Sequence, residues 1–221
     1  MIRRPTVLFL GLLFATAAGA GSGADIDKVN GSIRLHEGET AGKLSTVNGS
    51  VHLGDKASAE SIETVNGAVE LGSDCAARSI ETVNGHIALA ARTRIAETVE
   101  AVNGSIELER GADVAGHLSN VNGHIALNAA HVGGGIETVG GDVEIGADSH
   151  VEGGLLVERP NSTGWSWGKP KPPRIVIGPR AVVEGSLRFK REVELLVSDS
   201  AKVGPIEGAT PVKFSGDRPN G

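Results

Sequence analysis

Aliphatic residues recur along this chain with a period of eighteen or nineteen residues. The tripeptide Val-Asn-Gly marks the period: it begins six times between Val29 and Val121, and a Val-Gly-Gly variant begins at Val139. Three further columns hold only Ile, Leu or Val in all seven repeats; they lie three positions before this valine and four and six positions after it. A fixed period of this length predicts a solenoid, in which each repeat stacks on the next one.

The last two aliphatic columns define a short strand in each repeat. One polar or small residue separates them, as in "HIALA" (86–90) and "SIELE" (105–109). This alternation predicts a strand with one face turned inward. The Asn-Gly pair before it predicts a sharp corner, because both residues tolerate a positive φ. Each repeat therefore predicts one coil with a strand, a corner and a second strand.

The fold class predicted from this pattern is all-β, a parallel β-solenoid of about nine coils of 18–19 residues. We expect the coil to be right-handed. A single solenoid domain is expected over residues 21–205, followed by a C-terminal cap or tail over 206–221. Because strands stack about 4.8 Å apart, such a rod would be roughly 45 Å long.

The asparagines of the repeat are expected to form a vertical structural ladder. Stacked side-chain amides can hydrogen-bond from one coil to the next. A row of ligand-binding amides is the weaker alternative. The residues concerned are Asn30, Asn48, Asn66, Asn84, Asn103 and Asn122.

The segment "IETV" (62–65) leaves one point open. Strict alternation places Ile62 and Thr64 on one side of a strand and Val65 on the other. Either the strand bends before the valine, or the valine column packs outside the main core.

Residues 1–20 have the layout of a secretory signal peptide, with a basic start, an apolar run and a small-residue cleavage site at Ala18–Ala20. We therefore expect an exported protein, in the periplasm or secreted to the cell surface, with no transmembrane span after cleavage. Without these residues the chain carries 19 basic and 27 acidic side chains, which makes nucleic acid a poor partner. The single cysteine, Cys75, cannot form an internal disulfide and is predicted to be a small buried residue.

The repeated motif, as in "ETVNGHIAL" (81–89), resembles the adhesin-like family of exported bacterial β-strand-repeat proteins of unknown function. The resemblance covers residues 26–154 well and the remainder loosely. A fainter resemblance is to bactofilins, the polymer-forming β-helical cytoskeletal proteins. The first resemblance implies the architecture and export, and the second implies self-assembly.

The outward positions offer little chemistry. His86 and His124 share an outward column but lie two coils apart, too far for one metal ion, and no histidine or cysteine spacing typical of zinc occurs. We therefore expect no metal and no cofactor. No acid–base or nucleophile arrangement can be identified, so we do not expect an enzyme. Acidic columns are interpreted as a solvated face rather than a cation-binding stripe; they contain Glu63, Glu81, Glu100 and Glu137, and Glu70, Glu107 and Glu144.

The repeat is interrupted by a Trp- and Pro-rich insertion at 158–174, "ERPNSTGWSWGKPKPPR". The charge also changes sign here: residues 26–154 carry 8 basic and 19 acidic side chains, and residues 155–221 carry 11 and 7. Insertions in solenoids form loops on one face, often the binding face. Aromatic rings beside cations suit sugar rings, anionic glycans or lipid headgroups. The candidate ligand-binding residues are Arg159, Trp165, Trp167, Lys169, Lys171 and Arg174.

A structural alternative is that both indoles lie flat on the solenoid flank and cover apolar side chains. The functional prediction is a non-enzymatic surface or periplasmic binding and adhesion module, with an envelope glycan or another surface component as its partner. The alternative is a structural protein that self-assembles weakly through its solenoid ends. Its basis is that the first coil begins at Ile26, close to the expected cleavage site, which leaves an uncapped β-edge.

Overall fold

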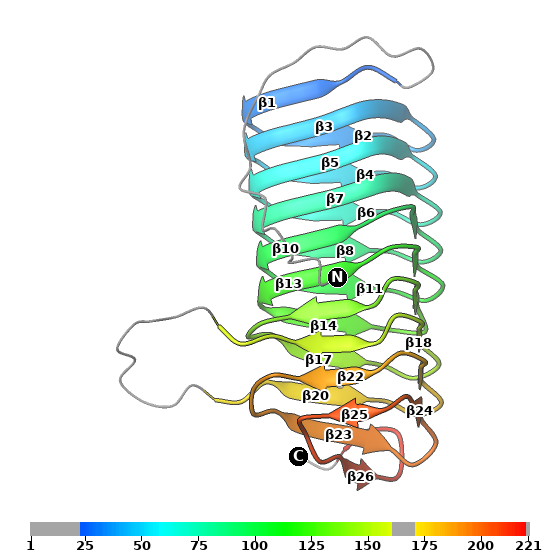
Figure 1. Ribbon diagram of the computed structural model, residues 1–221. Coiled ribbons are helices and arrows are strands. Elements are labelled where there is room, and N and C mark those ends of the chain that lie inside the picture. Colours follow the sequence, from blue (N-terminus) through cyan, green and yellow to red (C-terminus); the bar gives the residue numbers. More distant parts are fainter. Residues whose placement is uncertain (1–22, 161–170, 220–221) are drawn as a thin grey trace, which may run out of the picture.

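A computed structural model of the chain describes residues 23–160 and 171–219. Within these residues the regular secondary structure consists of β-strands alone, and neighbouring strands pair in parallel. The strands form one sheet of sixteen and one of ten, wound into a stack of coils from the N-terminal to the C-terminal end (Figure 1). The predicted parallel β-solenoid is confirmed. The ten strands of the second sheet correspond to about ten turns, against the nine or so expected.

After its first strand, the first sheet has three nine-residue strands and then continues with pairs of shorter ones. Its N-terminal part contains β1 (Ile26–Asn30), β3 (Thr40–Asn48), β5 (Ser58–Asn66) and β7 (Ala76–Asn84). One row of short strands then contains β9 (Arg94–Ile95), β12 (Asp113–Val114), β15 (His131–Val132), β18 (His150–Val151), β21 (Val182–Val183) and β24 (Lys202–Val203). The other row contains β10 (Val99–Asn103), β13 (Leu118–Asn122), β16 (Ile136–Thr138), β19 (Leu155–Val157), β22 (Leu187–Phe189) and β25 (Ile206–Glu207).

The second sheet contains the strands predicted from the alternating columns, one in each coil. They are β2 (Ile33–Leu35), β4 (Val51–Leu53), β6 (Val69–Leu71), β8 (Ile87–Leu89), β11 (Ile106–Leu108), β14 (His124–Leu127), β17 (Asp142–Ile145), β20 (Arg174–Ile177), β23 (Glu194–Ser198) and β26 (Val212–Phe214).

Equivalent residues of successive repeats stand directly on one another. Between β5 and β7, Ile62 pairs with Ile80 and Asn66 pairs with Asn84, so the two copies of "IETVNG" are stacked in register. The aliphatic columns of both sheets are buried; Ile80, for example, has no exposed surface. Stacking like on like gives the rod one continuous apolar core.

The valine of the repeat lies outside the main core. Thr46 and Thr64, one position before it, are buried, whereas Val29 is 59% exposed and Val102 is 37% exposed. Strand alternation therefore continues through the valine. The sequence left open whether the strand bends before the valine or the valine column packs outside the main core, and the structure has the second arrangement.

The spacing between the inner residue at the bend and the next aliphatic column decides whether the first sheet runs unbroken there. In β3, β5 and β7 the inner position at this bend is a buried alanine, such as Ala77, three residues before the aliphatic column at Ile80, and the strand is continuous. In the first nineteen-residue repeat Ile95 takes its place and pairs with Ala77. The extra residue forms a short corner over residues 96–98, which separates β9 from β10. The larger Ile95 side chain is fully packed at this corner.

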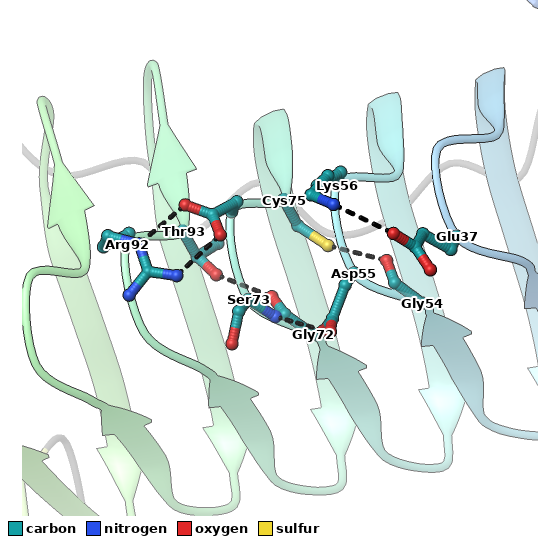
Figure 2. A network of polar contacts seen from close by, with 10 residues as sticks. Glu37, Gly54, Asp55, Lys56, Gly72, Ser73, Cys75, Arg92 and Thr93 are labelled. Carbon is teal, nitrogen blue, oxygen red and sulfur yellow. Dashed lines mark hydrogen bonds and ion pairs between the residues drawn. The ribbon is translucent and has the colours of Figure 1, made fainter.

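A third corner, after each strand of the second sheet, is stabilised by polar contacts (Figure 2). Lys56, Asp74 and Arg92 occupy its left-handed position, with φ between 60° and 61°. Asp74 and Arg92 make a bidentate pair, both bonds 2.7 Å long. Beneath them Cys75 is buried, and its Sγ donates to the Gly54 carbonyl oxygen at 3.0 Å. Burial raises the pKa of the Cys75 thiol, so it is a structural donor rather than a nucleophile.

The C-terminal residues extend both sheets. In the segment expected as a cap or tail, β25 pairs with β22 and β26 pairs with β23. The register of β26 places Lys213 opposite Val197, which belongs to a buried column. A charged residue at that place interrupts the apolar column and disfavours pairing with a further strand.

Candidate binding site at the insertion corner

The Asn-Gly corner joins the first sheet to the second sheet in the N-terminal coils. Each asparagine from Asn48 to Asn122 donates from Nδ2 to Oδ1 of the asparagine one coil earlier, at 3.0–3.2 Å. The following glycine is needed for close stacking, because a Cβ at Gly85 would lie 1.9 Å from the Gly67 carbonyl oxygen. The amides of this ladder are therefore engaged with one another.

The ladder stops where the insertion begins. After Asn122 the next coil has Gly140 at this position, and the coil after that carries the insertion between β19 and β20. Both β19 and β20 continue the sheets without a break, since β19 pairs with β16 and β20 pairs with β17 (Figure 1). The insertion therefore leaves the rod at the corner that the asparagines occupy in earlier coils.

Both feet of the insertion are bonded to the solenoid. At the first foot, the Arg159 guanidinium donates to the Lys190 carbonyl oxygen, and the Lys190 ammonium pairs with Glu158. At the second foot, the Arg174 backbone N–H donates to Asp142 Oδ1 at 2.7 Å. These contacts fix the points at which the insertion enters and leaves the rod.

The predicted site residues divide into two groups. Arg159, Lys171 and Arg174 belong to the described residues, where Arg159 and Lys171 are exposed and Arg174 is half-buried. Trp165, Trp167 and Lys169 lie outside the described residues, so their role stays a prediction. Arg174 is also part of β20, and its Nε lies 3.9 Å from Glu194 Oε2.

Sequence reasoning missed two cations at this corner. Lys190 and Arg191 follow β22, one coil after the insertion, and Arg191 Nη1 donates to the Val139 carbonyl oxygen at 3.0 Å. The adjacent basic pair in "FKRE" (189–192) was the available signal. The position of this pair in the rod could not be inferred from the sequence, because the insertion breaks the regular spacing that shows which residues stack on one another.

A separate group of histidines and carboxylates lies on the first row of short strands. His131 Nδ1 is 2.5 Å from Asp113 Oδ1, and His131 Nε2 is 3.1 Å from Glu152 Oε1. The hydrogen bond to Asp113 raises the pKa of His131; the one to Glu152 adds to this, while partial burial opposes it. Within residues 23–160 and 171–219, no group of three or more His, Cys, Asp or Glu side chains is arranged to hold a metal ion.

Acidic residues that form one column in the sequence also stand one above another in the first sheet. Glu81 stands between Glu63 and Glu100, and Lys43 pairs with Glu63 at 2.7 Å. Burial raises the pKa of Glu81, and the two neighbouring carboxylates raise it further. The stacked carboxylates repel one another, which a solvated face tolerates.

Fold and corner together define the chain as a parallel β-solenoid with one anchored insertion. Comparison with protein-family models, with curated proteins and with solved structures finds no match in any of the three. Membership of the adhesin-like family or of the bactofilins stays a prediction. Over residues 23–160 and 171–219 the structure has no helix that is long and apolar enough to cross a membrane.

Proposed function

We propose that this protein is an exported, non-enzymatic binding module of the cell envelope and that the insertion at 158–174 is its recognition loop. The observation that carries the proposal is the bonding of both feet of the insertion to a regular rod. Binding residues in proteins lie disproportionately on loops that a rigid scaffold positions. Anchored feet reduce the entropy lost when such a loop binds its partner.

The charge distribution supports an anionic or neutral glycan as the partner. The rod from residue 26 to residue 154 is acidic, with 8 basic and 19 acidic side chains. The corner, by contrast, gathers Arg159, Lys171, Arg174, Lys190 and Arg191. A polyanion would be repelled by most of the rod and attracted to this corner. The tryptophans of the insertion add the apolar surface that a sugar ring requires.

The test changes Trp165 and Trp167 together to Ala. We expect the double variant to lose most of its binding to isolated cell-wall glycan in a co-sedimentation assay, while its melting temperature stays almost unchanged. Replacing the exposed Lys28 and Arg34 by Ala, at the far end of the rod, serves as the matched control. A large fall in melting temperature with binding intact would mean that the indoles only cover the core.

Self-assembly is the second candidate, and the N-terminal edge favours it. Among the described residues, β1 pairs with β3 alone and β2 with β4 alone, which leaves one side of each strand open to another chain. At the opposite end Lys213 interrupts the apolar column and disfavours pairing with a further strand, so we propose dimers rather than filaments. Sedimentation velocity over a range of concentrations would show a dimer; long polymers or a strict monomer would contradict this.

A further inference from the structure

Three departures from the repeat lie on or beside the outer face of β16, β19 and β22. The first is Leu156, the middle residue of β19. It belongs to an outward column that is otherwise polar or charged in every described coil. The column contains Asp27, Ser45, Glu63, Glu81, Glu100, Ser119, Glu137, Leu156, Arg188 and Glu207.

The second departure is a corner made of glycine. Gly135 and Gly154 precede β16 and β19 and have φ values of 99° and 89°, in the left-handed region. A Cβ at Gly154 would lie 2.4 Å from the Ser186 carbonyl oxygen, so the stack admits no side chain there. In earlier coils the residue before the strand is Thr98 or His117. The bare backbone leaves a depression in the surface.

The third departure is the insertion itself, which begins two residues after Leu156. The Glu158–Lys190 pair at its first foot lies in the coils of β19 and β22. Because a solenoid repeats whatever its core requires, places where it departs from the repeat are expected to serve function. Here Leu156 and the glycines adjoin on one face, and the insertion begins at the end of the same strand, β19.

The depression has a volume of about 210 Å³. Leu156 lies half-buried in its wall, with Glu137 and Arg188 on either side of it in the column. Ser186 and the exposed His117 complete the polar lining. Arg188 also forms an ion pair with Glu207, its neighbour in the next coil, and the distance from Arg188 Nε to Glu207 Oε2 is 3.4 Å.

Glu137 is a half-buried carboxyl group in the wall of the depression. Burial raises the pKa of Glu137 and the neighbouring Glu158 raises it further, while the cation of Lys190 and the His117 ring act in the opposite direction. Hydroxyl groups can satisfy such a carboxyl in either protonation state, because they donate and accept hydrogen bonds. A side chain of this kind therefore suits a ligand rich in hydroxyls.

We propose that this depression binds one pyranose ring of the envelope glycan, with the ring's C–H face on Leu156 and its hydroxyls on Glu137, Ser186 and Arg188. The inference rests on the proposed function. The depression is smaller than the roughly 300–1,000 Å³ of pockets for larger ligands, so it suits a single ring. A small zwitterion would use Glu137 and Arg188 but leave Leu156 without a role.

Saturation-transfer NMR with methyl β-glucopyranoside and with N-acetylglucosamine tests this on the full chain. We expect transfer to the ring protons of at least one of the two sugars. Leu156→Ser should weaken binding about tenfold or more, as losing an apolar contact does. Serine occupies the same column at Ser45 and Ser119, so the solenoid should keep its melting temperature. Glu137→Gln should also weaken binding, whereas Glu81→Gln, in the same column, should not.

Three results would overturn the inference: no transfer to either sugar at millimolar concentration, sugar binding unchanged in both Leu156→Ser and Glu137→Gln, or transfer to glycine, the zwitterion probe, in place of sugar. The outcome is separable from that of the proposed function. Capture of cell-wall glycan without binding of either sugar defeats only this inference. Sugar binding that depends on Leu156, without capture of cell-wall glycan, defeats only the proposed function.

Discussion

At the scale of single residues, His131 has the clearest dependence on conditions. Both of its ring nitrogens face carboxylates, Asp113 on β12 and Glu152 after β18, which is the arrangement of a protonated ring. The His150 ring lies 5.4 Å away on β18, and its Nε2 is 2.9 Å from Glu184 Oε1. The contacts of His131 span three coils, so the ring acts as a clip between them.

We predict that this clip stabilises the protein at low pH and loses its effect as the pH rises. The folded-state pKa of His131 is raised, so its contribution is fully present below the unfolded value of about 6.5 and is lost as the pH passes through the folded value. His131→Gln should therefore lower the melting temperature most at about pH 6 and least at about pH 8.5. His124→Gln is the matched control. A difference that grows as the pH rises would contradict the assignment.

At the scale of elements, residue patterns predict the strands better than their bends. The alternating columns predict every strand of the second sheet from β2 to β17, because burial of one face requires that alternation. The split of the first sheet was not predicted. It depends on whether the corner holds Ala77 or Ile95, and the aliphatic columns counted in the sequence do not include that position.

Exchange of side chains at this corner should destabilise both kinds of coil. Ile95→Ala removes a buried side chain and should lower the free energy of unfolding by about 2–5 kcal/mol. Ala77→Ile forces a larger side chain into the narrow bend and should lower it by about 1–3 kcal/mol. Denaturant unfolding gives both values. Tolerance of Ala77→Ile without loss would mean that the continuous bend does not require a small side chain.

The candidate site was only partly accessible from sequence for a related reason. Stacking brings together residues one coil apart, so contacts can be read from the repeat while the spacing stays regular. Across the insertion the spacing in the second sheet jumps from Val143 to its partner Ile175, and the neighbours of Glu158 could not be found by counting. The basic pair Lys190 and Arg191 and the depression beside Leu156 therefore emerged only from the structure.

At the scale of the whole molecule, the rod is a regular support that changes character at one place. The N-terminal coils repeat a core, an amide ladder and an acidic outer face. The ladder stops after β13, and beyond β16 the charge reverses and the insertion leaves the corner. The sequence predicts about nine turns and the structure has about ten; the last strand, β26, places Lys213 over the buried Val197 and so breaks the aliphatic column.

The central claim is that the rod supports and the insertion binds. Replacing residues 158–173 with Val-Asn-Gly would restore the repeat between β19 and β20, whose neighbours β16 and β17 already have the required register. The measurement is binding to isolated cell-wall glycan, with melting temperature recorded on the same sample. The account predicts an equal or higher melting temperature and loss of glycan binding. A shortened protein that still melts cooperatively and binds the glycan as well as the intact chain would contradict it.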